Sequence, residues 1–155
     1  MTKETIKTFQ YRITQATASQ LVVILYDMAI EYLNDACESD SAKQAHNNIY
    51  MAQKVIDQLI CGLDMQYEIS ANLFVIYNHM KRSLISASVS LDNNEINRIT
   101  GLLKKLRASF YEVSKQDDSE PLMKNTEKVY SGLTYSRYGA NEMAQDTLGN
   151  RGYKA

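Results

Sequence analysis

Apolar side chains recur at every third or fourth residue in four long segments, which is the spacing of one face of an α-helix. The first segment begins after Thr17, where Thr17 and Gln20 can form a capping box, and fades near Glu38. The others span about residues 42–63, 67–91 and 94–114. The expected core stripes are Leu21, Ile24, Leu25, Met28, Tyr32 and Ala36; Ala45, Ile49, Ala52, Ile56, Leu59 and Leu63; Ile69, Leu73, Ile76, Met80, Leu84, Ala87 and Leu91; and Ile96, Ile99, Leu103, Leu106, Phe110 and Val113.

Short polar connections separate these segments, so successive helices should be antiparallel neighbours. The pattern predicts an all-α protein, an antiparallel up-down four-helix bundle. Upstream, Ile6, Phe9 and Ile13 form a narrow stripe that suits a short helix lying on the bundle. Downstream of Pro121 a brief helix through Leu122 and Tyr130 is expected, and then a partly extended tail rich in Gly, Asn and Tyr. We therefore divide the chain into a helical bundle, residues 1–131, and a tail, residues 132–155.

Composition narrows the function classes. The chain has 155 residues, 45% hydrophobic and 23% charged, with a formal net charge of −1, which favours one globular domain and argues against a nucleic-acid binder. No apolar run approaches the roughly 18 residues that span a bilayer, and no signal peptide is recognisable, so no membrane insertion is expected. Cys37 and Cys61 lie in no paired motif and are interpreted as reduced thiols, Cys61 within a packed face. These features predict a cytoplasmic protein.

Candidate catalytic chemistry is sparse. His46 and His79 are the only histidines, and neither has the Glu-x-x-His spacing of a di-iron bundle, so we expect no metal, no cofactor and no catalytic residue. His79, followed by Lys81 and Arg82, leaves a histidine phosphotransfer module as a distant alternative. Gly101, inside the fourth segment, is interpreted as a close helix–helix contact.

The apolar surface is larger than one core needs. Residues 21–26 are hydrophobic around the whole helix, so Val22, Val23 or Tyr26 should lie outside the central core, and Phe74, Val75 and Tyr77 widen the third segment in the same way. The terminal segments could cover this surface, or an amphipathic helix of a partner could dock on it. A generic helical adaptor or self-associating bundle would use the same surface.

Several stretches, in order, resemble the FliS family of flagellin export chaperones. Leu-Val-Val-Ile-Leu-Tyr-Asp at residues 21–27 is similar to the family's first bundle helix, and Ala-Gln-Lys-Val-Ile-Asp-Gln-Leu at residues 52–59 to its second. Residues 69–87 resemble its third helix, and Phe110 stands where the family usually has Trp. The resemblance covers about residues 13–112. Ala18 departs from it by replacing the usual proline after the cap.

The resemblance implies a binding protein rather than an enzyme. Its expected partner is the C-terminal segment of flagellin, disordered in the monomer, which the chaperone wraps against its bundle to prevent premature polymerisation before delivery to the flagellar type III export gate. The N-terminal stripe of Ile6, Phe9 and Ile13 would cover part of the groove in the free chaperone. The expected client-binding residues are Val22, Leu25, Tyr26, Ala29, Ala52, Val55, Ile56, Leu59, Tyr77 and Met80.

Overall fold

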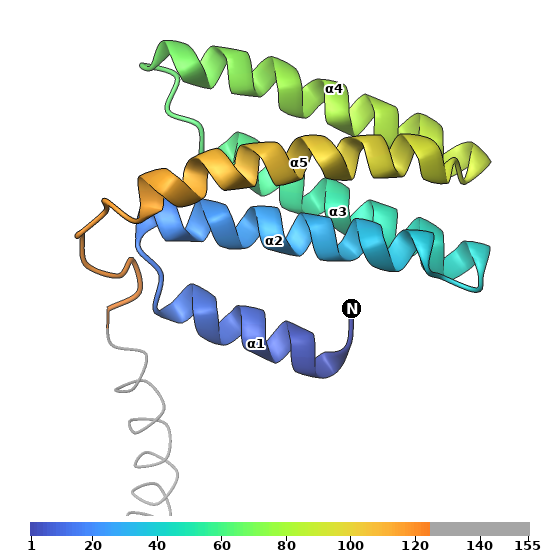
Figure 1. The fold of residues 1–155 in the computed structure, drawn as a ribbon, viewed down its shortest axis with the longest axis horizontal. Coiled ribbons are helices and arrows are strands. Elements are labelled where there is room, and N and C mark those ends of the chain that lie inside the picture. The colour runs from blue at the N-terminus through green and yellow to red at the C-terminus, as the bar shows by residue number, and fades with distance from the viewer. Residues whose placement is uncertain (125–155) are drawn as a thin grey trace, which may run out of the picture. The chain divides into compact units, whose positions relative to one another are not determined.

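The computed structural model describes residues 1–124, and this part of the chain is helical, as predicted. Its helices are α1 (Lys3–Thr14), α2 (Ala18–Cys37), α3 (Ala42–Cys61), α4 (Glu68–Ser90) and α5 (Asn93–Ser114) (Figure 1). Helices α2 to α5 form the predicted antiparallel bundle, and α1 is the predicted short N-terminal helix. The predicted boundary between residues 131 and 132 lies outside the described residues. No helix is visible in residues 119–124, the described start of the segment around Pro121.

Side-chain caps fix where three of the bundle helices begin. The Thr17 hydroxyl accepts the Gln20 amide while the Gln20 side chain accepts the Thr17 amide, which confirms the capping box before α2. The Ser41 hydroxyl caps α3 by accepting from the amide of Gln44, and the Asp92 carboxylate caps α5 by accepting from the amides of Asn94 and Glu95. Each such cap typically stabilises a helix by about 1 kcal/mol. Helix α4 differs, because its N-cap residue, Tyr67, provides no side-chain hydrogen bond.

A very short turn joins α4 to α5. Leu91 ends α4 in the left-handed conformation, with φ 52°, and the Asp92 amide donates to the carbonyl of Ala87. This pairing satisfies carbonyl groups that the last turn of a helix leaves free. The chain can therefore reverse direction at once, and Asp92 caps the next helix.

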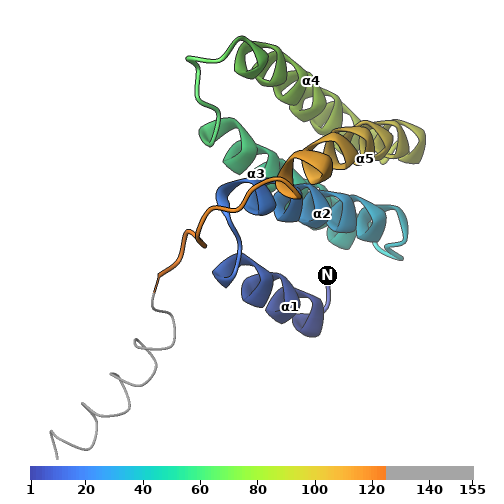
Figure 2. The same cartoon turned by 60° about the vertical axis from the view of Figure 1, so that its left-hand side comes forward.

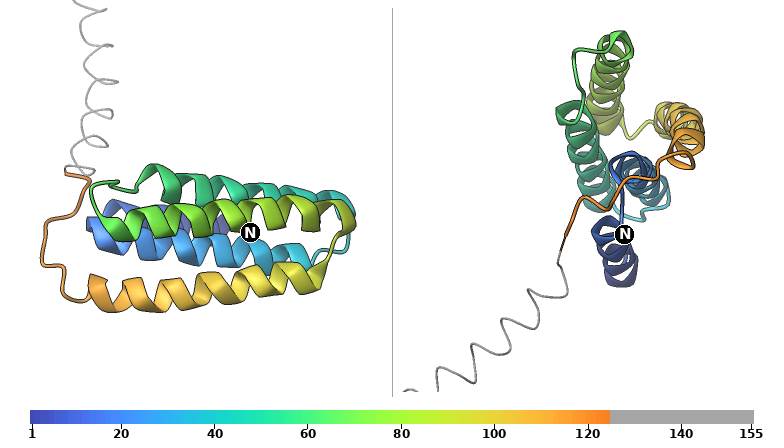
Figure 3. Two further views of the ribbon diagram at one scale, coloured as in Figure 1. Left: turned by 90° about the horizontal axis from the view of Figure 1, so that it is seen from above. Right: turned by 90° about the vertical axis from the view of Figure 1, so that its left-hand side faces the viewer.

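Helix α2 occupies the centre of the arrangement. It packs against α3 on one side and α5 on another, while α4 packs against α3 and α5 and lies diagonally across the bundle from α2 (Figures 2 and 3). Helix α1 lies outside the bundle against α2. Thus α2 is covered on three sides, and α4 is the most open of the four bundle helices.

The hydrophobic core runs along the axis of the bundle. Its largest fully buried side chains are Tyr26, Leu33, Ile49, Ile56, Tyr77, Met80, Leu84, Ile96, Ile99 and Leu103. Full burial of a large apolar side chain contributes about 1.5–3 kcal/mol, so each of these residues stabilises the fold substantially. A second, smaller cluster joins Phe9 and Ala16 to Ile24, on the side of α2 that faces α1.

The structure corrects the predicted faces of α2 and α4. Tyr26 and Tyr77, expected outside the core, are fully buried in it, whereas Ile69 and Ile76, expected inside, are 62% and 38% exposed. Val113, the last residue of the predicted α5 stripe, is also exposed. In α2 and α4 apolar residues occupy more than one face, so two overlapping stripes fit the same helical period and only tertiary packing selects one.

Two smaller predictions were also wrong. Gly101 makes no close helix–helix contact, since a Cβ built there would meet nothing within 4 Å. Cys61 is exposed at the end of α3 rather than packed, although both cysteines are free thiols as expected.

Candidate functional site

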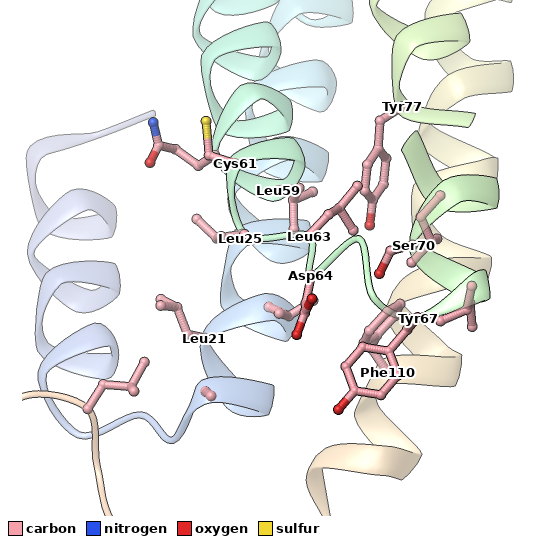
Figure 4. A pocket seen from close by; sticks show the side chains of 17 residues that line it. Leu21, Leu25, Leu59, Cys61, Leu63, Asp64, Tyr67, Ser70, Tyr77 and Phe110 are labelled. Carbon is pink, nitrogen blue, oxygen red and sulfur yellow. The ribbon is translucent and has the colours of Figure 1, made fainter. Parts of the chain in front are cut away.

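An apolar groove opens between the first half of α2 and the start of α4 (Figure 4). Its volume is about 720 Å³. Hydrophobic side chains from four helices and the α3–α4 loop form most of its wall. The lining residues are Ala18, Leu21, Val22, Leu25, Gln58, Leu59, Cys61, Gly62, Leu63, Asp64, Tyr67, Ile69, Ser70, Leu73, Tyr77, Phe110 and Leu122.

The groove exists because α4 leaves the bundle at this end. Helices α4 and α5 meet at the turn through Leu91 and diverge toward the other end of the bundle (Figure 1). The connection between α3 and α4, residues 62–67, is longer than that turn and carries α4 away from α2. Met65, Tyr67 and Ile69 at this rim are each more than 60% exposed. The groove is therefore apolar both on its wall and at its rim.

Three aromatic rings build the floor between α2, α4 and α5. The Tyr26 ring lies 6.4 Å from that of Tyr77 and 5.6 Å from that of Phe110, both tilted, and the two tyrosine hydroxyls share a hydrogen bond. Desolvation by burial raises the pKa of both tyrosines, so both are neutral at physiological pH. Tyr77 and Phe110 line the groove, while Tyr26 lies behind them.

The chain that follows α5 closes one end of the groove. The Leu122 amide donates to the carbonyl of Ala16 at 3.0 Å, and its side chain joins the groove lining. The Asp117 carboxylate accepts from both the amide and the hydroxyl of Ser19. Hydrogen bonds from Ser119, and then from Ser19 and Thr17, hold the pKa of Asp117 well below its usual range. The junction between α1 and α2 is thereby tied to the end of the bundle.

One carboxylate links three helices beside the groove. Asp27 on α2 accepts from Arg12 of α1 at 2.7 Å and from Arg107 of α5 at 2.9 Å. The Arg107 guanidinium also lies over the ring of Tyr111. These two ion pairs tie α1 and α5 to α2.

The family model described as flagellar protein FliS matches residues 1–117. The chain belongs to the FliS family. It is 26% identical over 101 residues to the flagellar secretion chaperone FliS of Bacillus subtilis (strain 168), a match that covers 63% of this chain and 76% of the relative. The predicted resemblance is confirmed, and the family is one of chaperones rather than enzymes.

The FliS match spans every helix of residues 1–124 and every groove residue except Leu122. Leu122 lies five residues beyond the matched span, so this part of the wall belongs to a segment that the FliS model does not include. The groove itself is built within the FliS-like part of the chain.

The structure divides the predicted client-binding residues into two groups. Val22, Leu25, Leu59 and Tyr77 line the groove. The others are buried in the core and do not line it: Tyr26, Ala29, Ala52, Val55, Ile56 and Met80. Client contact by any of these residues stays a prediction, and contact by the buried group would require the bundle to open.

Sequence reasoning missed part of the wall. Leu21, Leu63 and Leu73 belonged to predicted core stripes, but Asp64 lies in a connection with no helical period, so no pattern marked it. Leu122 was assigned to a downstream segment that could cover the surplus apolar surface, but it was not among the expected groove residues. The apolar residues Met65 and Tyr67, placed in a short connection, are the one sequence signal that could have indicated this end of the groove.

The predicted covering helix lies elsewhere than expected. In α1, Phe9 is buried against Ile24, Ile13 is half-buried and Ile6 is 38% exposed, and none of these residues lines the groove. Helix α1 packs on a neighbouring face of α2. The role of Ile6, Phe9 and Ile13 as a groove cover stays a prediction of the FliS resemblance.

The histidines occupy separate, exposed positions. His46 on α3 contacts the Ser88 hydroxyl of α4 through Nδ1 at 3.3 Å, and His79 is exposed on α4. Within residues 1–124 no three His, Cys, Asp or Glu side chains are placed to hold a metal ion. The same residues contain no helix that is long and apolar enough to cross a membrane.

Proposed function

We propose that this chain is a cytoplasmic flagellar export chaperone that binds the C-terminal segment of flagellin. Binding would prevent premature polymerisation of flagellin and deliver it to the type III export apparatus. The observation that supports this function best is an open apolar groove within the span that matches the FliS family. The curated relative, itself named a flagellar secretion chaperone, supports the export role.

The groove has the chemistry of a helix-binding surface. Leu21, Val22 and Leu25 form one wall and Ile69 and Leu73 the other, so an amphipathic helix could bury its apolar face between them. A client that is disordered before binding loses conformational entropy when it folds there. The affinity therefore stays low for the area buried, which suits a chaperone that must release its cargo.

The direct test is calorimetric titration of this chain with the C-terminal segment of flagellin from the same organism. We expect one-to-one binding with a negative heat-capacity change and a gain of helix by the segment. Absence of heat and of helix gain, with the chaperone folded, would contradict the proposed function. Self-association measured by sedimentation would then be the next hypothesis to examine.

Leu25→Asp tests whether the groove is the binding surface. The side chain of Leu25 is half-buried in the wall, and a carboxylate there would be desolvated by the client, so we expect an affinity loss of at least about tenfold. Val89→Asp is the matched control, because Val89 is an exposed apolar residue of α4 outside the groove, 85% accessible. Circular dichroism should show both variants helical. Equal affinity of the two variants would place the client elsewhere.

A further inference from the structure

One hydroxyl at the groove has no protein partner but stays open to solvent, since no fully buried side-chain oxygen or nitrogen atom of the described residues lacks a partner. Ser70, in the first turn of α4, is 5% exposed and lines the groove, yet its hydroxyl forms no hydrogen bond with any other residue of the described part of the chain. A client that covers this hydroxyl must offer it a partner, because buried hydroxyls are nearly always paired. Elsewhere the fold follows this rule, since the buried Thr100 and Ser114 hydroxyls donate to the carbonyls of Ile96 and Tyr111.

A second donor points into the same space. The Tyr26 and Tyr77 hydroxyls carry two protons, and their mutual hydrogen bond uses one. Tyr77 is the member of the pair that lines the groove, so the second proton can be directed there when Tyr26 donates to Tyr77. Figure 4 shows the Ser70 and Tyr77 hydroxyls pointing into the same part of the pocket, above Tyr67 and Phe110. This end of the groove thus offers two donors amid apolar walls.

The negative charges near Ser70 and Tyr77 favour a neutral acceptor group on the client. Asp64 lines the same pocket, and Glu68 lies in the first turn of α4 next to Ser70. Two carboxylates would repel a carboxylate of the client, whereas a neutral amide has no such cost. An amide also has an oxygen that accepts from the two hydroxyls and an NH₂ group that can donate to Asp64.

We infer that this end of the groove, defined by Ser70, Tyr77 and Asp64, receives the carboxamide of an Asn or Gln side chain of the client. The inference rests on the proposed function and specifies it: the client helix must present one amide among its apolar residues. The amide fixes the register of the helix, because an apolar side chain in its place would leave two donors unpaired. A client shifted by one turn would meet the same penalty.

Ser70→Ala tests this inference with two measurements that should change in opposite directions. The variant loses a hydroxyl that has no partner in the free chain and gains the better helix former, so its melting temperature should be unchanged or higher. Its affinity for the flagellin segment should fall about 2- to 10-fold, the usual effect of one lost hydrogen bond. A merely structural serine would not separate the two measurements.

Ser114→Ala is the matched control. Ser114 is as buried as Ser70, but its hydroxyl is paired and it lies outside the groove. This variant should lower the melting temperature slightly and leave the affinity unchanged. If Ser70→Ala lowers the melting temperature as Ser114→Ala does, or leaves the client affinity unchanged, the inference is wrong.

A scan of the client completes the test. Each Asn of the flagellin segment is replaced by Leu and each Gln by Met, which keep the size of the side chain. One replacement should weaken binding to the wild-type chaperone and have little further effect on Ser70→Ala, because both changes remove the same interaction. Additive losses at every position would overturn the inference while leaving the proposed function intact. No binding by the wild-type chain would overturn the proposed function and this inference with it.

Discussion

The two ends of the bundle differ in how completely they are packed. At one end, short turns at residues 38–41 and 91–92 hold the helices together, and Leu33, Ile49, Leu84 and Ile96 are fully buried. At the other end, the connection of residues 62–67 lets α4 diverge, and the groove opens (Figure 1). We call these the closed end and the groove end.

The two ends of the bundle therefore contribute differently to the stability of the fold and to the binding of a client. The core side chains at the closed end, such as Leu33 and Leu84, are already covered by the chain itself, so they stabilise the fold and offer no surface to a partner. At the groove end, Val22, Leu25 and Phe110 are only partly covered and can still bury area against a client. Mutations at the two ends should therefore affect different measurements.

The largest effect is expected at the closed end. Leu33 is fully buried, so Leu33→Ala should lower the free energy of unfolding by about 2–5 kcal/mol through lost burial and the cavity left behind. Leu25→Ala, the same change at the groove end, removes a half-covered side chain and should cost about 1 kcal/mol or less. Urea denaturation followed by helical circular dichroism measures both. Equal losses would show that the groove end is as tightly packed as the closed end.

Local signals in the sequence predicted the helices well. Thr17, Ser41 and Asp92 lie before apolar periodic segments, and each caps a helix in the structure because capping depends only on neighbouring residues. The short connections at the closed end followed from the same signals. The fold class was therefore accessible without tertiary information.

The groove was less accessible because its shape is not local. Residues 21–26 are apolar on every face, so the sequence allowed Tyr26 on the surface, and only packing against Tyr77 and Phe110 places it inside. The divergence of α4 depends on the whole bundle, and within residues 62–67 the apolar Met65 and Tyr67 are the only sequence signal that points to it. Ser70 shows the same limit, since its missing partner is visible only once the surrounding side chains are placed.

A smaller effect is expected where α1 joins the groove-end half of α2. Asp27→Asn keeps the shape of the side chain but removes the charge that holds Arg12 and Arg107, so the free energy of unfolding should fall by about 1 kcal/mol. Hydrogen exchange should become faster in α1 than in α3 and α4. Asp57→Asn is the control, because it breaks the ion pair with Lys81 between α3 and α4 and does not touch α1. Faster exchange in α1 with the control variant would show that Asp27 has no special role there.

The smallest effect is a dependence of stability on pH to which both ends contribute. At the closed end, the hydrogen bond from Arg98 lowers the pKa of Glu95 from 4.5 to about 2, and at the groove end hydrogen bonds from Ser119 and Ser19 lower the pKa of Asp117. A carboxylate with a lowered pKa in the folded state stabilises the fold above its unfolded pKa, and this contribution is lost as the pH falls through the folded value. Stability should therefore decrease between about pH 5 and pH 2, and less steeply in Glu95→Gln and in Asp117→Asn.

Asp117→Asn and Glu95→Gln should differ in which backbone amides exchange faster. Asp117→Asn should also speed exchange of the Ser19 amide, which donates to Asp117, and Glu95→Gln should leave that amide unaffected. Glu4→Gln serves as the control, because Glu4 forms no ion pair with any residue of the described part of the chain. An equal flattening of the pH profile by Glu4→Gln would mean that overall charge, rather than these two hydrogen-bonded carboxylates, sets the acid sensitivity. A profile unchanged by Asp117→Asn would show that the contact with Ser19 does not stabilise the groove end.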